Sequence, residues 1–219
     1  MHKQGSLAVG AVVLAAGSGS RMGHRPKSLL KLNGMALIER QIKSLSIAGV
    51  QRMEVVLGHH AAHMARALQP LCVNITHNPD PGPDTASSLR IGLQALPSNL
   101  DAVLVALADQ PLITSQDITD LVRAYTHRPA GTQWVQPEVD GMPGNPVMFS
   151  SEVRQQILAG NAGMGGPQWR TEHPEQVHRW PSPNTHYCID IDTPEDIEAL
   201  ATLTGHRLSW PAEWTETPT

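Results

Sequence analysis

Short apolar runs rich in valine and leucine alternate along the first two-thirds of this chain with segments whose apolar residues have helical spacing. One run, residues 102–108 (AVLVALA), is apolar throughout, which is typical of a strand covered on both faces. The alternation predicts an α/β fold: a three-layer, Rossmann-like arrangement with a mostly parallel sheet and helices on both faces. The 18 glycines and 18 prolines indicate many turns rather than a helical bundle.

The expected strands share a β-rich apolar composition and span residues 8–16, 54–57, 73–76, 102–108, 133–137, 146–149 and 187–191. The expected helices cover residues 36–48, 60–68, 85–96, 114–125, 151–159 and 193–202, with Thr193 as the cap of the last. We expect irregular structure between residues 160 and 183, which are first glycine-rich and then polar. The predicted organisation is one domain over residues 1–204 and a polar surface tail over residues 205–219.

Composition narrows the class of protein. The 219 residues are 40% hydrophobic and 16% charged, which supplies a core and leaves too little charge for a disordered chain. The net charge is -4 and no basic run contains aromatic residues, so nucleic acid is not an expected partner. No stretch of consecutive apolar residues reaches the roughly 18 residues that a membrane-spanning helix requires. The apolar run 7–16 has the length of a signal-peptide core, but its valines favour a buried strand, and we expect a cytoplasmic protein.

Residues 12–27 (VVLAAGSGSRMGHRPK) predict a site for phosphate groups. A strand leading into Gly17, Ser18, Gly19 and Ser20 presents backbone N–H groups without bulky side chains, and Arg21 and Lys27 add two cations. The dinucleotide motif GxGxxG fails because Met22 takes the place of its last glycine, and the P-loop motif fails too. The alternative is a structural turn with solvated cations. We favour a polyphosphate cradle of another kind.

The loop resembles the signature of the MobA-like nucleotidyltransferases. The segments that carry the resemblance are residues 14–17 (LAAG) with 21–23 (RMG) and Lys27, residues 82–92, residues 107–111 (LADQP), residues 141–147 (GMPGNPV) and residues 190–196 (DIDTPED). They occur in this order over residues 8 to about 203. The resemblance implies a nucleotidyltransferase that joins a phosphate monoester to a nucleoside triphosphate and expels pyrophosphate.

Within that family the loop is most similar to the molybdenum cofactor cytidylyltransferases, since Ala16 stands where guanylyl-transferring relatives carry glycine. This implies CTP as donor and a molybdopterin-type acceptor. On the acceptor side, Gly144, Asn145 and Pro146 replace the family's GHP, with Asn145 in place of histidine. Residues 160–166 (GNAGMGG) lack the charged residues of the family's GDxGAR stretch. The alternatives are another nucleotide, a sugar or alcohol phosphate as acceptor, or a non-catalytic maturation partner of a molybdoenzyme.

Such a transfer requires donors for the phosphates and a divalent metal, for which we expect Mg²⁺. Asp109 follows the most apolar strand and is the first metal candidate; Asp192, or alternatively Asp190, is the second. Arg21 and Lys27 are assigned to the triphosphate, and these two with Asp109 form the expected catalytic set. The remaining nucleotide-binding candidates are Leu14, Ala15, Ala16, Gly17, Ser18, Gly19, Ser20, Ser87 and Ser88. We expect a monomer or weak dimer that meets a molybdoenzyme or its chaperone.

Overall fold

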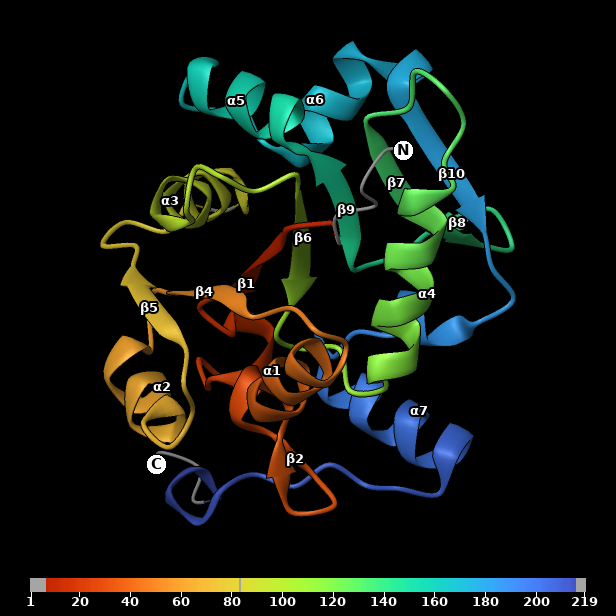
Figure 1. Ribbon diagram of the computed structural model, residues 1–219. Coiled ribbons are helices and arrows are strands. Elements are labelled where there is room, and N and C mark those ends of the chain that lie inside the picture. Colours follow the sequence, from red (N-terminus) through yellow and green to blue (C-terminus); the bar gives the residue numbers. More distant parts are fainter. Residues whose placement is uncertain (1–6, 83, 216–219) are drawn as a thin grey trace.

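The computed structural model describes residues 7–82 and 84–215 and has an α/β architecture (Figure 1). A central sheet has the strand order β10-β7-β9-β6-β1-β4-β5, and β8 pairs with β7. The strands are β1 (Val9–Ala15), β4 (Arg52–Leu57), β5 (Asn74–His77), β6 (Ala102–Leu107), β7 (Trp134–Val139), β8 (Met142–Pro143), β9 (Val147–Ser150) and β10 (Val177–Pro181). Strands β6, β1, β4 and β5 run parallel, whereas β9 is antiparallel to both β6 and β7. The predicted mostly parallel α/β fold is confirmed.

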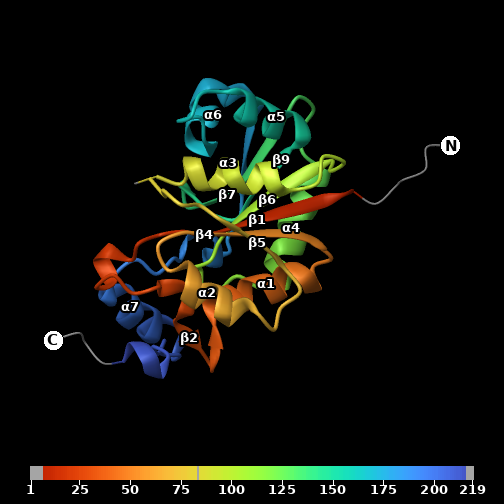
Figure 2. The ribbon, with the colours of Figure 1, turned by 90° about the vertical axis from the view of Figure 1, so that its left-hand side faces the viewer.

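Helices cover both faces of the sheet (Figure 2). The helices are α1 (Leu37–Ile47), α2 (Ala61–Leu68), α3 (Ala86–Ala95), α4 (Ser115–Thr126), α5 (Ser151–Ala159), α6 (Gly166–Glu172) and α7 (Pro194–Thr204). Helices α1, α2 and α4 pack in one apolar cluster on one face of the sheet. Helices α3, α5 and α6 pack in another on the opposite face. Along β1 and β6 successive side chains alternate between these clusters. This is why both strands are apolar at every position.

Two segments differ from the sequence prediction. The expected strand at residues 187–191 is absent from the described chain: residues 185–188 form a short 3-10 turn, with the Asn184 side chain accepting from the amide of His186. The edge position beside β7 is filled instead by β10, which lies in the stretch expected to be irregular, as does α6. The carbonyl of Tyr187 accepts from Asn145 and Gln110 and joins no strand ladder.

The predicted tail begins at Gly205, which ends α7 in a left-handed conformation. Leu208 is buried, and Ser209 forms a backbone bridge with Lys31 in the small hairpin of β2 (Lys31–Leu32) and β3 (Met35–Ala36). Trp210 lies under the guanidinium of Arg25, 4.3 Å from it. Residues 208–214 therefore pack against the segment that follows the glycine loop, while residues 1–6 and 216–219 of the predicted domain and tail lie outside the described residues.

Candidate active site

The carboxyl ends of three parallel strands meet at one edge of the sheet. Strand β1 pairs with β4 and β6, and Leu14 is in register with Val56 and Leu107. The glycine loop follows β1 and Asp109 follows β6, so the topology brings these two predicted elements together. In open α/β sheets this edge is where ligands bind.

The glycine loop makes a tight turn that leaves backbone donors free. Gly19 has a φ of +63°, and a Cβ there would lie 2.1 Å from the carbonyl oxygen of Arg25, so only glycine fits. Its carbonyl accepts from the amides of Met22 and His24 at 2.8 and 2.9 Å. By contrast, the amides of residues 17–20 donate to no other group within the described chain. Four amides and no bulky side chain make a suitable anion cradle.

Lys27 lies between two carboxylates of the site. Its Nζ lies 2.5 Å from Asp109 Oδ2 and 2.5 Å from Asp192 Oδ1, and Arg21 Nη2 lies 2.6 Å from Asp192 Oδ2. Burial lowers the pKa of Lys27, but the two carboxylates outweigh it and raise the pKa above its usual value. Burial raises the pKa of Asp192, yet Lys27 and Arg21 together lower it below the ordinary range. Four predicted charged residues thus lie in one cluster: Arg21, Lys27, Asp109 and Asp192.

The acidic side of this cluster has negative charge that the protein leaves unpaired. Asp109 Oδ1 is buried and has no hydrogen-bond partner among the described residues. Burial, and then the charges of Asp109 and Asp192, raise the pKa of Asp190. An oxygen-ligated divalent cation would match these carboxylates, and one or two of them suffice for Mg²⁺. In the present conformation no three acidic, cysteine or histidine side chains of the described residues are arranged as a metal site, since Lys27 lies between Asp109 and Asp192.

A cleft extends from the carboxylates along the edge of the sheet. Its first part has a volume of about 240 Å³. The residues that line it include Ala16, Gly17, Asp84, Ser88, Asp109, Asp190 and Asp192. Its second part, about 280 Å³, lies towards α6. Leu14, Thr85 and Leu107 line both parts, so the two parts adjoin. A narrow space of about 40 Å³ behind the loop is lined by Ala15, Lys27 and His60.

The two predicted serines share a hydrogen-bond partner. The side-chain amide of Asn78 donates to Ser87 Oγ at 3.0 Å and to Ser88 Oγ at 2.9 Å. Ser88 is buried and lines the first part of the cleft, whereas Ser87 does not. The N-cap of α3 is Thr85, without a side-chain capping bond, so neither serine is the helix cap.

Two glutamine side chains donate hydrogen bonds to the backbone of segment 144–146, which was predicted on the acceptor side. Gln136 Nε2 donates to the carbonyl of Gly144, and Gln110 Nε2 donates to the carbonyl of Asn145, both at 3.1 Å. Asn145 lines the second part of the cleft, and Gly144 is buried beside it. Pro146 does not line the cleft. This segment therefore lies at the end of the cleft away from the carboxylates.

Three residues of the site had no role in the sequence prediction. Gln110 was visible only as part of the LADQP motif. His60 places Nε2 3.1 Å from the carbonyl oxygen of Ser18 in the glycine loop. Arg170 lines the second part of the cleft from α6, and no motif marks it. Residues 160–166 carry no charge, and the helix that follows them brings the cation of Arg170 to the cleft.

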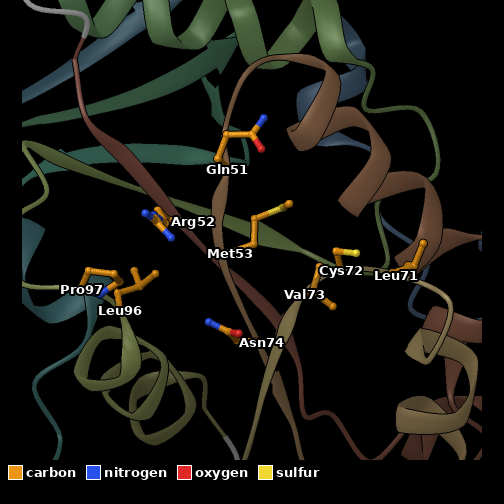
Figure 3. A pocket seen from close by; sticks show the side chains of 9 residues that line it. All are labelled: Gln51, Arg52, Met53, Leu71, Cys72, Val73, Asn74, Leu96 and Pro97. Atoms are coloured by element: carbon orange, nitrogen blue, oxygen red, sulfur yellow. The ribbon is translucent and has the colours of Figure 1, made fainter.

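A separate hollow of about 440 Å³ lies at the opposite edge of the sheet, where β4 and β5 begin (Figure 3). Its lining includes Arg52, Cys72 and Asn74, and Figure 3 shows these side chains spread around the hollow rather than converging. It holds no cluster of ionisable groups comparable to that around Lys27. The cleft at the carboxyl edge remains the candidate active site.

Comparison with known proteins agrees with this geometry. The model of the MobA-like NTP transferase domain matches residues 11–177. The chain belongs to the MobA-like NTP transferase family. The match includes the glycine loop, Asp109 and the acceptor segment, and the family confirms the nucleotidyltransferase class predicted from the sequence. It ends before Asp190 and Asp192, which the fold brings to the same cleft.

Individual relatives and structural neighbours extend the likeness to 88–91% of the chain. A nicotine blue oxidoreductase of Paenarthrobacter nicotinovorans is 36% identical over 200 residues, 88% of this chain and 93% of that protein. A nucleotidyl transferase from Methanothermobacter is similar in structure, with a TM-score of 0.72, 25% identity and coverage of 91% and 98% of the two chains. A 4-diphosphocytidyl-2C-methyl-D-erythritol synthase from Anaerococcus prevotii has the same fold, with a TM-score of 0.68, 18% identity and coverage of 90% and 96%. Among the residues that the structure describes, no helix is long and apolar enough to cross a membrane.

Proposed function

We propose that this chain transfers CMP from CTP to the phosphate monoester of a molybdopterin-type acceptor and releases pyrophosphate. The observation that carries the proposal is the cluster of Lys27, Asp109 and Asp192 beside a loop with free backbone amides. That pairing of cations, carboxylates and amide donors matches a triphosphate with its metal. The Leu14-Ala15-Ala16-Gly17 form of the loop supports CTP as the donor.

In this reaction an oxygen of the acceptor phosphate forms a bond to the α-phosphorus of CTP, and the bond from that phosphorus to the β-phosphate oxygen breaks. The electron pair leaves with pyrophosphate. The attacking oxygen is already ionised near neutral pH, so no general base is required, and charge neutralisation and positioning supply the rate.

The chain's own residues divide this work. The amides of residues 17–20 bind the β- and γ-phosphate oxygens, and Arg21 neutralises charge that develops on the leaving pyrophosphate. Lys27 acts as a point charge at the α- or β-phosphate. Asp109, with Asp192 or Asp190, would hold a divalent metal ion, which supplies further charge neutralisation at the phosphates. The second part of the cleft is the side from which the acceptor phosphate enters.

The first experiment is a thermal-shift panel of CTP, GTP, ATP and UTP, each with and without Mg²⁺. A nucleotide at a hundred times its dissociation constant stabilises by about 2.7 kcal/mol, which is a shift of about 5–10 °C for a chain of this length. We expect selective, Mg²⁺-dependent stabilisation by CTP, followed by pyrophosphate release when molybdopterin is added. Stabilisation by another nucleotide would replace CTP in the proposal. No pyrophosphate from any acceptor would refute the transfer.

The oxidoreductase that is 36% identical over 93% of its length favours a second candidate, a redox reaction in the same cleft. The test mixes the chain with nicotine blue and a chemical reductant, with no nucleoside triphosphate added, and follows the absorbance of nicotine blue. Reduction that is faster with the chain than without it and that survives loss of Asp109 would favour this candidate over nucleotidyl transfer, because such a reaction makes no demand on a phosphate-bound metal.

A further inference from the structure

Arg170 is a half-buried cation at the acceptor end of the cleft. It lies on α6 and lines the space of about 280 Å³. Its Nη1 donates to Gln136 Oε1, and its Nε donates to the carbonyl of Gly166 at 3.4 Å. Burial, and then the charge of Arg179, lower the pKa of Arg170. No carboxylate of the described chain pairs with it, although burying a charge is costly unless it is paired.

A buried arginine with a purely structural role looks different in this chain. Arg154 directs its guanidinium onto the carbonyls of Leu93, Leu96 and Pro97 at the end of α3, so its donors are used by the protein. A guanidinium carries five N–H donors, and Arg170 uses two of them in the contacts above. Its guanidinium also lies over the Trp134 ring, 5.6 Å from the ring centroid. The remaining N–H donors form no hydrogen bond within the described residues.

The walls around Arg170 restrict what that ligand can be. The second part of the cleft is mostly apolar, with Leu89, Val105 and Val147 among its lining residues. Besides Arg170, its polar side chains are Thr85, Gln136 and Asn145. Trp134 adds an indole N–H that is buried and has no hydrogen-bond partner among the described residues. Apolar walls leave the hydroxyls of a sugar without partners, and a buried hydroxyl without a partner is costly. A flat ring with polar atoms confined to one edge suits this space.

We propose that Arg170 is a specificity-determining residue that binds oxygen atoms on the edge of a flat heterocyclic acceptor. The proposal rests on the proposed function, because it assigns the acceptor of that reaction to the second part of the cleft. The ring occupies the apolar space, and its oxygen-bearing edge faces the guanidinium. The part shared with the nucleotide, at Leu14, Thr85 and Leu107, leads the acceptor phosphate towards CTP.

The first test measures binding without catalysis. The probe is pterin-6-carboxylate, a fluorescent flat heterocycle with an anionic edge, titrated into the wild-type chain, Arg170→Gln and Arg170→Lys. A hydrogen bond to a charged group corresponds to about a tenfold to hundredfold change in affinity. We expect Arg170→Gln to raise Kd by that factor and Arg170→Lys to recover part of it. Arg123→Gln is the matched control, because Arg123 is an exposed arginine of α4 that pairs with Asp120 and does not line the cleft, and its Kd should stay within twofold.

Equal Kd values for the wild-type chain and Arg170→Gln would overturn the assignment, and so would the absence of wild-type binding at millimolar probe. Stabilisation of each variant by CTP shows that it is folded and that its nucleotide part is intact.

The second test separates this inference from the proposed function. In the pyrophosphate assay with molybdopterin, Arg170→Gln should raise KM for the acceptor by about tenfold to hundredfold and change kcat far less. Unchanged KM with active enzyme would refute the role of Arg170 and leave nucleotidyl transfer standing. Arg170-dependent binding of the pterin probe, with no pyrophosphate released by the wild-type chain, would refute the transfer and leave the heterocycle site standing.

Discussion

Replacing Lys27 with methionine should have opposite effects on metal binding and on turnover. The ammonium of Lys27 lies between Asp109 and Asp192, 2.5 Å from an oxygen of each. A divalent cation that uses both carboxylates must displace it. In Lys27→Met that competition is gone, so we expect tighter metal binding in the absence of nucleotide. The same change removes a positive charge assigned to the phosphates, and turnover should fall.

The size of the effect follows from the two contacts. Hydrogen bonds between charged groups contribute about 1.5–3 kcal/mol each when shielded from water. The Asp192 side chain is 30% exposed and that of Asp109 is 14% exposed, so solvent screening reduces this figure. We expect a net gain of about 1–2 kcal/mol, which is about a fivefold to thirtyfold lower Kd for the metal. Loss of a preorganised cation in a transfer site corresponds to about a hundredfold or larger fall in kcat.

Mn²⁺ is a suitable probe because its free aquo ion is counted directly by electron paramagnetic resonance. Titrations of the wild-type chain, Lys27→Met and Lys31→Met give the comparison. Lys31 is a partly buried lysine near Lys27, and its side chain contacts no carboxylate in the described residues. The Lys31→Met variant should therefore bind Mn²⁺ with the same Kd as the wild-type chain. An unchanged or higher Kd in Lys27→Met would refute the idea that the ammonium and the metal compete for Asp109 and Asp192.

Three further changes test other parts of the argument. Asp109→Asn should lower pyrophosphate release by about a thousandfold, whereas Asp120→Asn, on the exposed face of α4, should change it less than twofold. Gly92→Ala places a Cβ 2.5 Å from Val12 Cγ1 and should destabilise the folded chain by about 1–3 kcal/mol, seen by calorimetry as a Tm lower by about 2–12 °C. Because the pKa of Asp190 is raised in the folded chain, its ionised form destabilises near neutral pH. Asp190→Asn should therefore be more stable than wild type at pH 7 in urea unfolding, and the difference should vanish as the pH falls below about 3.9.

The parts of the fold that the sequence predicted are those set by local pattern. β1 and β6 are buried on both faces, so each is an unbroken apolar run that is visible without its partners. Their parallel pairing then places the glycine loop and Asp109 at the same edge. The capping box of α7, formed by Thr193 and Asp196, is also local, and it frees Asp192 to face Lys27.

The segments that were mispredicted depend on distant contacts. Residues 177–181 and 187–191 are both short and partly apolar, and only pairing with β7 decides which becomes a strand. Helix α6 begins at Gly166-Pro167, which gives little local helical signal. It is held by Trp169, which is fully buried and stacks with Trp134 and His173. Arg170 lines the cleft only because this packing forms a helix there. The second part of the cleft was therefore less predictable from the sequence than the first.

The two halves of the cleft nevertheless form one hydrogen-bonded unit. Gln110 follows Asp109 in the chain, and its side-chain amide donates to the carbonyls of Asn145 and Tyr187, both at 3.1 Å. The turn that contains Tyr187 is anchored in turn by buried Asp117, whose carboxylate accepts from Asn184 at 2.7 Å. Two residues after that turn the chain supplies Asp190, and then Asp192. A shift of segment 144–146 would therefore be passed on to the segment that carries Asp190 and Asp192, so the positions of these two segments are set together.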